Sequence, residues 1–495
     1  MAWLPRLPLR LTTWWILLGG ALAFGVAAWQ VAQPSGPAKV ILLESALPSR
    51  GRDVGPGLDI LVSDLLEILG GATLTHAKSL PGPGELQQLA PDTHLVRVQG
   101  SRAAEGLALD LQWNTAGGLI SGRPWNHREV AATVPFEALT SLVAAWPFSP
   151  RRQSLEALVP RSAARFWELL EAASIRDDLE AAGHLEASQR LAEAEPACAT
   201  AWATLGDHLY RSLWVNPQLT GVGLNSRTHQ AFRRAVELVP GHPRATFLWS
   251  LMLTDTGNQA LAIEALRRAT DLRPKVPDLY LGLAYAGRTA GLLEGARRAI
   301  ERRQALLGPT GGPSAWVAET TYLYLGDRAA FQRELAKVGA LRQDASVLFY
   351  QGYLALLNSD TPAAMAFMRR GGDPAMGPIP FRDLCRVYLA QMEGRRQEGL
   401  RELRDIDEIR GKLHVPDGEW TFKEAEAYAI LGDADRAVDC ATRAFVQGFS
   451  CARWYESSPL LASARSHPRW PTLIRNVRER QAVLEGSFPP SAFLP

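Results

Sequence analysis

Small residues recur at fixed positions within a helical pattern of apolar residues along much of the chain. In residues 427–445, Gly432 is followed by Ala437 and Ala444, and apolar positions return at three- and four-residue steps. The same glycine and alanines recur at the same spacing in residues 246–274. Small residues allow two antiparallel helices to approach closely, and large neighbours fill the gaps between them. The pattern therefore predicts helix pairs that repeat along the chain.

The repeat unit is 34 residues long where it is clearest, from Pro243 to Pro277. Weaker copies continue toward the C-terminus, so we expect about eight helix pairs between Ala163 and Val477. One pair cannot bury its apolar face alone, and the pairs must therefore stack. We expect a mostly α fold in which residues 160–480 form an α-solenoid with a C-terminal cap, followed by a tail over residues 481–495.

The repeated glycine, alanines and closing prolines resemble the tetratricopeptide repeat. The resemblance implies a superhelix whose concave groove is lined by the first helix of each pair. It also implies a protein or peptide partner in that groove, where aromatic and arginine side chains are effective anchors. The residues that the resemblance assigns to the groove are Asp207, Tyr210, Arg211, Arg244, Phe247, Asp255, Asp278, Tyr285 and Arg288.

Residues 39–148 follow a different pattern, in which apolar positions alternate as in strands that bury one face. A short apolar run opens the segment, and a helix beginning near Gly57 carries leucines at helical steps. Further along, we expect Gly117 and Gly118 to form a hairpin turn before a last strand that ends at Trp125. The predicted order, β-α-β-α-β-β-β-α, describes a small α/β domain.

This order, together with the strand "LVRVQGS", resembles the amino-terminal type of domain found in TolB. The asparagine- and aspartate-containing segment usual after the first strand of that family is replaced here by "ALPSRGRDVG". With the repeats and the ending "HPRW", the chain resembles the sensory half of membrane-anchored bacterial regulators. The kinase or winged-helix output half of such regulators has no counterpart in the sequence.

Residues 12–32 form an apolar segment without a charge, and a bilayer core takes about 20 such residues as a helix. Trp14, Trp15 and Trp29 lie near its two ends, where aromatic rings favour the headgroup level. We expect a single transmembrane helix here. A cleaved signal peptide is the alternative, although the apolar run is long for one.

The orientation of this span follows from the charges around it. Arg6 and Arg10 precede it and favour a cytoplasmic tail of residues 1–11, whereas Lys39 on the other side opposes this. We expect a linker over residues 33–38 and an inner (cytoplasmic) membrane location, with the bulk of the chain periplasmic or otherwise extracytoplasmic.

Composition and motifs limit the chemistry. The 53 Lys and Arg nearly balance 51 Asp and Glu, which argues against a nucleic-acid-binding chain. No phosphate-loop, zinc-protease or nucleophile-elbow motif occurs, so we expect no catalytic residue and no cofactor. His76, His94 and His127 share the small domain without metal-ligand spacing. Cys440 and Cys451 are close enough in sequence to pair in an oxidising compartment, but four cysteines do not make a disulfide scaffold.

Three functional hypotheses follow. The first is a membrane-anchored, non-enzymatic scaffold that holds a protein or peptide partner in the groove of its repeats. The alternative is a signal-input subunit that senses a ligand and acts on a separate output protein. An enzyme that uses the small domain is a distant third. The oligomeric state is open.

Overall fold

The computed structural model describes residues 39–49, 52–103, 106–132, 135–144, 155–215, 223–308, 317–376, 380–412 and 415–495. The expected cytoplasmic tail (1–11), transmembrane helix (12–32) and linker (33–38) lie outside the described residues. Within the described part, none of the helices combines the length and the apolar character that a membrane crossing requires.

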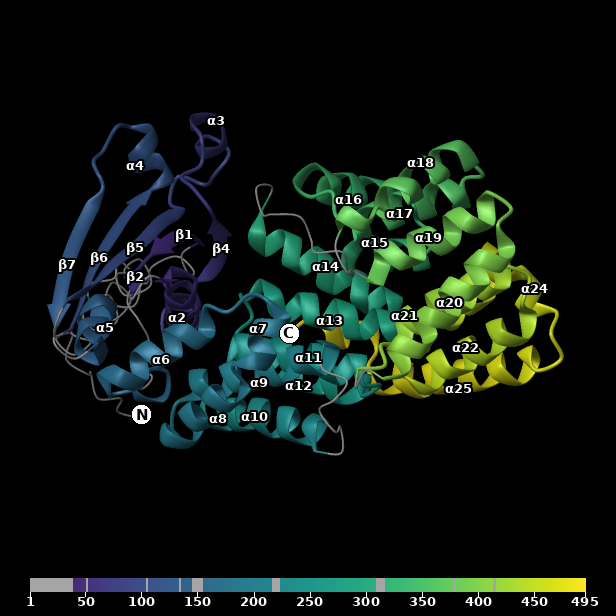
Figure 1. The fold of residues 1–495 in the computed structure, drawn as a ribbon. Helices are drawn as coiled ribbons and strands as arrows, with labels where there is room; N and C mark the ends of the chain where they lie inside the picture. The colour runs from purple at the N-terminus through teal and green to yellow at the C-terminus, as the bar shows by residue number, and fades with distance from the viewer. Residues whose placement is uncertain are drawn as a thin grey trace, which may run out of the picture.

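The N-terminal part is a five-stranded sheet with helices on both faces (Figure 1). The strand order is β4-β1-β5-β6-β7, with β1 parallel to β4 and β5, and with β5, β6 and β7 antiparallel. A small separate hairpin joins β2 to β3. The elements are β1 (Lys39–Ala46), β2 (Pro48–Ser49), β3 (Arg52–Asp53), α2 (Gly55–Ile68), β4 (Thr73–Ala77), α3 (Pro83–Leu86), β5 (His94–Ala103), β6 (Gly106–Thr115), α4 (Ala116–Ile120), β7 (Asn126–Ala132) and α5 (Pro135–Ala144).

Alternation along the strands places apolar residues on both faces of the sheet. In β1, Val40 and Leu42 belong to the large core that includes α2, whereas Ile41 and Leu43 pack on the opposite face, where α3 and α4 lie. A strand with both faces covered reads as a continuous apolar run rather than a half-buried one. The apolar run that opens residues 39–148 therefore forms β1, a strand inside the sheet between β4 and β5.

The last strand lies later in the chain than the sequence predicts. The expectation of a hairpin turn at Gly117 and Gly118 and a strand ending at Trp125 is wrong, because α4 occupies this stretch and β7 begins only at Asn126. The reason is local capping: the Thr115 hydroxyl accepts a 3.0 Å hydrogen bond from the Gly118 amide and starts a helical turn. The side-chain amide of Asn114 then donates 3.1 Å hydrogen bonds to the carbonyls of Arg123 and Pro124, which closes the loop before β7.

The rest of the chain is a helical repeat solenoid (Figure 1). Consecutive helices form antiparallel pairs from α9 with α10 through to α21 with α22. The helices and 3₁₀ turns of this part are η1 (Leu155–Ala157), α6 (Ala163–Ala173), α7 (Asp178–Gly183), α8 (Leu185–Ala194), α9 (Ala199–Val215), α10 (Leu224–Leu238), α11 (Pro243–Asp255), α12 (Gln259–Leu272), α13 (Pro277–Thr289), α14 (Leu293–Leu307), α15 (Val317–Tyr324), α16 (Arg328–Leu341), α17 (Ala345–Leu357), α18 (Thr361–Gly371), η2 (Pro374–Met376), α19 (Pro380–Met392), α20 (Arg396–Gly411), α21 (Gly418–Ile430), α22 (Ala434–Val446), α23 (Ala452–Ser457), η3 (Pro459–Leu461), α24 (Ala462–Arg465), α25 (Trp470–Ser487) and η4 (Pro490–Phe493).

The recurrent small residues have the two roles that the pattern predicts. Gly257, Gly291 and Gly432 all adopt positive φ, at 85°, 81° and 75°, in the turn between the helices of a pair. Within a pair, Gly206 lets Phe232 approach so closely that a Cβ there would lie 2.6 Å from the ring. Phe232 is fully buried as a result.

The end of the solenoid folds back onto its first repeats, and the C-terminus lies beside α13 (Figure 1). Residues 481–495 are not a detached tail, because α25 continues to Ser487 and Phe493 is fully buried in the core of the first repeats. The ring fills a slot left by Gly287 and Gly295, where added Cβ atoms would lie 2.6 and 2.4 Å from it. A large apolar side chain near the terminus thus secures the closure.

Candidate functional site

Because the solenoid closes on itself, its first and last repeats line an open cavity of about 640 Å³. One wall comes from α9, α11 and α13, which are the first helices of three successive pairs. The facing wall comes from α17, α19 and α21 and from the segment before α21. This volume lies within the range of about 300–1,000 Å³ that is typical of ligand sites.

The structure brings most of the residues assigned to the groove together on this cavity. The ones that line it are Asp207, Tyr210, Arg211, Phe247, Asp255 and Tyr285. Arg244 lies behind the wall, where it donates a 3.1 Å hydrogen bond to Asp207. Arg288 is also behind the wall and fully buried, and it pairs with Glu419 at 2.6 Å. Asp278 does not line the cavity; its carboxylate is exposed and lies 3.9 Å from Arg303.

The far wall of the cavity was missed by the sequence reasoning. Phe381 and Trp420 face it as an edge-to-face pair with ring centres 4.8 Å apart, and the Arg410 guanidinium lies 5.3 Å from the centre of the Trp420 ring. Trp214 and Tyr350 add two further aromatic side chains to a lining that also carries charged groups. The repeat assignment considered only the first helices of the early pairs, and a groove that closes on itself has a second wall.

Two carboxylates meet in the cavity. The Asp417 amide donates a 3.0 Å hydrogen bond to the Asp255 carbonyl, which brings the C-terminal end of α11 to the start of α21. The Asp255 carboxylate accepts hydrogen bonds from the hydroxyls of Tyr210 and Tyr285, the latter at 2.5 Å. Burial, and then the negative charge of Asp417, raise the pKa of Asp255 to about 8. Burial also raises the pKa of Asp417.

Asp417 has an unusual backbone. Its φ is 40°, in the left-handed region that residues other than glycine rarely adopt, although aspartate tolerates it better than most. The residue is also the N-cap of α21, and its carboxylate accepts the Trp420 amide at 3.1 Å. The strained residue is held by the hydrogen bond to Asp255 on one side and by the helix cap on the other.

Helix α21 carries charges that are buried on every side, and each has an opposite partner. Glu419 pairs with Arg288, and Lys423 pairs with Glu426 at 3.0 Å. Glu424 accepts from Arg410 at 2.9 Å. This wall could have been identified from the sequence of α21, because the helix mixes aromatic residues with glutamates and a lysine around its whole circumference. Buried charges persist only when they are paired.

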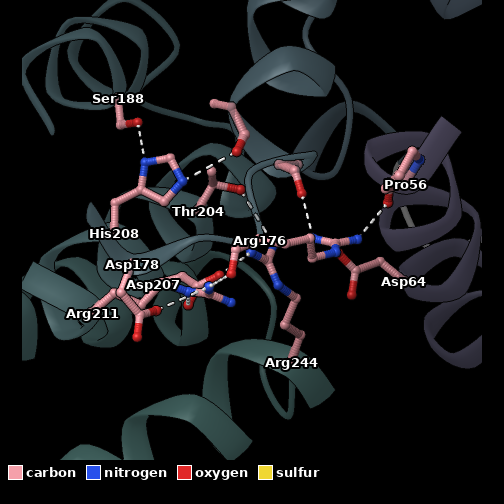
Figure 2. A network of polar contacts seen from close by, with 12 residues as sticks. Pro56, Asp64, Arg176, Asp178, Ser188, Thr204, Asp207, His208, Arg211 and Arg244 are labelled. Atoms are coloured by element: carbon pink, nitrogen blue, oxygen red, sulfur yellow. Dashed lines mark hydrogen bonds and ion pairs between the residues drawn. The ribbon is translucent and has the colours of Figure 1, made fainter. Parts of the chain in front are cut away.

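A polar network connects this cavity to the small sheet domain (Figure 2). Arg211 bridges Asp207 at 2.9 Å and Asp178 at 3.3 Å on the cavity side. It also donates a 2.8 Å hydrogen bond to the carbonyl of Arg176, whose guanidinium donates to the Pro56 carbonyl of α2 at 3.0 Å. Contacts therefore run without a break from the small domain to the cavity wall.

A second cavity of about 480 Å³ lies where the edge of the sheet meets the end of α14. Its lining includes Lys39 and His76 from the strands, Lys78 just after β4, and Leu306 and Gly308 from the repeats. Burial lowers the pKa of His76 below its ordinary value.

The histidines and cysteines considered from the sequence form neither a metal cluster nor a disulfide in the part of the chain that the structure describes. His76, His94 and His127 belong to β4, β5 and β7, and the described residues contain no group of three or more potential metal ligands. Cys440 and Cys451 are both buried as free thiols, and burial raises their pKa values to about 12.

No protein-family model matches the chain, and no curated protein matches it. Among solved structures, a chain in the crystal structure of the APC/C hetero-tetramer Cut9–Hcn1 is similar at 13% sequence identity, with a TM-score of 0.40. The match covers 72% of this chain and 68% of that chain. A likeness at this level says nothing about what this chain binds.

Proposed function

We propose that the chain is a non-enzymatic scaffold of the tetratricopeptide-repeat kind, which holds a segment of a partner protein in the cavity lined by its repeats. The observation that carries this proposal is the cavity itself, a space of about 640 Å³ on the inner helices of the solenoid with aromatic side chains on both of its walls. Aromatic side chains supply large contact area at low cost in conformational entropy, so they dominate binding interfaces.

The arrangement favours binding over catalysis. A catalytic site needs a nucleophile or a general base positioned against a reacting atom. In the described part of the cavity wall, Arg211, Arg410 and Lys423 are each engaged in ion pairs with carboxylates. Such groups position a ligand and stabilise the wall. The Asp255 carboxylate, whose pKa is raised to about 8, is likewise engaged by the hydroxyls of Tyr210 and Tyr285.

We also propose that residues 12–32 anchor the scaffold in the inner membrane, with the repeats on its extracytoplasmic side. The support is the uncharged apolar segment with tryptophans near its ends. The test is fractionation of cells that produce the full chain or a variant without residues 1–38. The proposal predicts membrane association of the first and its loss in the second, and it falls if both fractionate alike.

A signal-input role is a second candidate, and two observations favour it. The second cavity lies at the junction of the sheet domain with α14, where a small ligand would contact both parts. The network in Figure 2 joins the sheet domain to the wall of the larger cavity. A ligand in one cavity could therefore change the other, and an Arg176→Ala variant would uncouple the two.

The scaffold role is tested by affinity capture from cells with cavity variants. Trp214→Ala and Phe247→Ala remove aromatic surface from the wall, whereas Leu261→Ala and Leu272→Ala alter exposed leucines on α12. The proposal predicts that one partner is recovered with the wild type and both α12 controls, and is lost with the wall variants. Circular dichroism verifies that every variant folds. Equal recovery with all variants would refute the assignment.

A further inference from the structure

We propose that the cavity recognises an arginine side chain of its partner, whose guanidinium binds between Asp255 and Asp417 and whose neighbours in the partner's chain pack on the aromatic wall. This inference rests on the proposed scaffold function and specifies the chemistry of its ligand.

The charges that line the cavity carry the argument. Each basic side chain in the wall already has a carboxylate partner: Arg211 with Asp207, Arg342 with Asp344, Arg410 with Glu424, and Lys423 with Glu426. Among the acids, Asp178 and Asp207 pair with Arg211, and Glu419 pairs with Arg288.

Asp255 is the exception. It forms no ion pair in the described part of the chain, and the hydrogen bonds that it accepts come from uncharged tyrosine hydroxyls. For Asp417, burial raises the pKa, and the charges of Arg410 and Arg288 act against this rise. A carboxylate oxygen accepts two hydrogen bonds, so each oxygen of Asp255 retains capacity for another donor. The negative charge of Asp417 disfavours the ionisation of Asp255, and a cation that binds beside Asp255 relieves that repulsion.

The surroundings of the pair suit a guanidinium in particular. Tyr210 and Tyr285 flank Asp255, and Phe381 and Trp420 lie across the cavity. A guanidinium is planar, stacks on aromatic faces and donates to two carboxylates at once. It also remains charged at every relevant pH, so it is attracted by the negative charge of these acids throughout. An ammonium group makes neither the planar stacking contact nor the forked hydrogen bonds.

Holding Asp255 and Asp417 close together costs free energy in the folded chain. Asp417 keeps a left-handed backbone, with φ of 40°, and its amide is fixed to the Asp255 carbonyl. Burial and like charge raise the pKa of Asp255 to about 8. Neutral amides at both positions would remove the repulsion, and a purely structural contact between α11 and α21 needs only the backbone hydrogen bond.

The test uses the full chain and three tripeptide probes that differ at the central residue: acetyl-Leu-Arg-Leu-amide, its citrulline counterpart and its lysine counterpart. Citrulline keeps the shape of arginine and removes its charge. Dissociation constants are measured by NMR titration for the wild type, Asp417→Asn, Asp255→Asn and the control Asp271→Asn, which alters an exposed aspartate on α12.

We expect the arginine probe to bind the wild type and the control at least about tenfold more tightly than either counterpart, as a charge-assisted hydrogen bond contributes on this scale. In the Asp417→Asn and Asp255→Asn variants this preference should fall sharply. Equal binding of the arginine and citrulline probes would overturn the inference, as would an undiminished preference in both variants.

Failure of the inference is distinguishable from failure of the scaffold function. If no probe binds but partner capture is still lost with Trp214→Ala and Phe247→Ala, the cavity binds a partner by other chemistry and only the arginine assignment is wrong. If capture is also independent of the wall, both proposals are wrong.

Discussion

The Asp417 amide donates a 3.0 Å hydrogen bond to the Asp255 carbonyl, and this contact joins α11 near the start of the solenoid to α21 near its end. Two further contacts lie on the same closure. The Ser450 amide donates to the Thr289 carbonyl at 2.8 Å, and Phe493 fills a slot in the first repeats. Together they give the groove a second wall and place Asp255 and Asp417 at its lining.

The first prediction concerns Asp255 and pH. The groups that face its carboxylate are Tyr210, Tyr285, Asp417 and Glu419, and burial followed by the charge of Asp417 raises its pKa to about 8 from an ordinary value of 3.8. The folded chain therefore holds this proton more tightly than the unfolded chain. Its contribution to the free energy of unfolding is complete below pH 3.8 and is lost as pH rises through the folded pKa.

The Asp255→Asn variant, which is neutral at all pH values, escapes this loss. We expect its melting temperature relative to the wild type to increase from about pH 5 to about pH 9. Differential scanning calorimetry across this range measures the difference, with Asp271→Asn as the control that should stay level. A difference for Asp255→Asn that does not change with pH would contradict the assignment.

The second prediction concerns the buried pair of Arg288 and Glu419, whose side chains are 1% and 9% exposed and 2.6 Å apart. Glu419 also accepts the Tyr324 hydroxyl at 2.6 Å. Glu419→Gln removes the carboxylate that pairs with the buried guanidinium, and we expect a loss of about 3 kcal/mol in the free energy of unfolding. Adding Arg288→Met to this variant should recover part of the loss. Urea denaturation of the four combinations tests this, and additive effects would mean that the two side chains are not coupled.

The third prediction concerns the closure at the C-terminus. Phe493 is fully buried against Gly287 and Gly295, whereas the next residue, Leu494, is 38% exposed. Phe493→Ala removes a buried ring and should lower the free energy of unfolding by about 3 kcal/mol. Leu494→Ala, the matched control, should change it by less than about 0.5 kcal/mol. Chemical denaturation separates the two, and equal effects would show that the terminus is not part of the folded core.

The fourth prediction concerns acid stability. His208 is buried, with hydrogen bonds to the Ser188 hydroxyl at 2.8 Å and to the Ala172 carbonyl at 3.1 Å, and burial lowers its pKa to about 4. Its contribution to stability is present above the ordinary pKa of 6.5 and is lost as pH falls through the folded value. A His208→Gln variant should therefore lose less stability than the wild type between about pH 6.5 and pH 4. Equal losses in a thermal-melt series would contradict this.

Much of the architecture could be predicted from local pattern. The glycines at 257, 291 and 432 mark turns that need positive φ, and the apolar run at residues 40–43 marks a strand, which the structure covers on both faces. The hairpin expected at Gly117 failed because Thr115 supplies a helix cap, and such a cap has the same composition as a turn. The same local composition favours both a helix start and a hairpin turn, so the local sequence alone does not distinguish them.

The site was harder to predict than the fold. Repeat positions on α9, α11 and α13 identified one wall, including Tyr210, Phe247 and Tyr285. The other wall, with Phe381 and Trp420, depends on how far the solenoid curls, and that is set by many small packing angles between successive pairs. Asp278 was placed in the groove by its position in the repeat, yet the structure turns it toward Arg303.

The central claim is that a partner polypeptide enters the cavity between the first and last repeats, and photo-crosslinking tests it most directly. The probe residue p-benzoylphenylalanine is introduced in cells at Phe247 or Phe381, on opposite walls, and at the exposed Leu261 on α12 as the control. The account predicts that both wall positions crosslink to the same short segment of one partner and that the control does not. Crosslinks from Leu261 with none from either wall would contradict it.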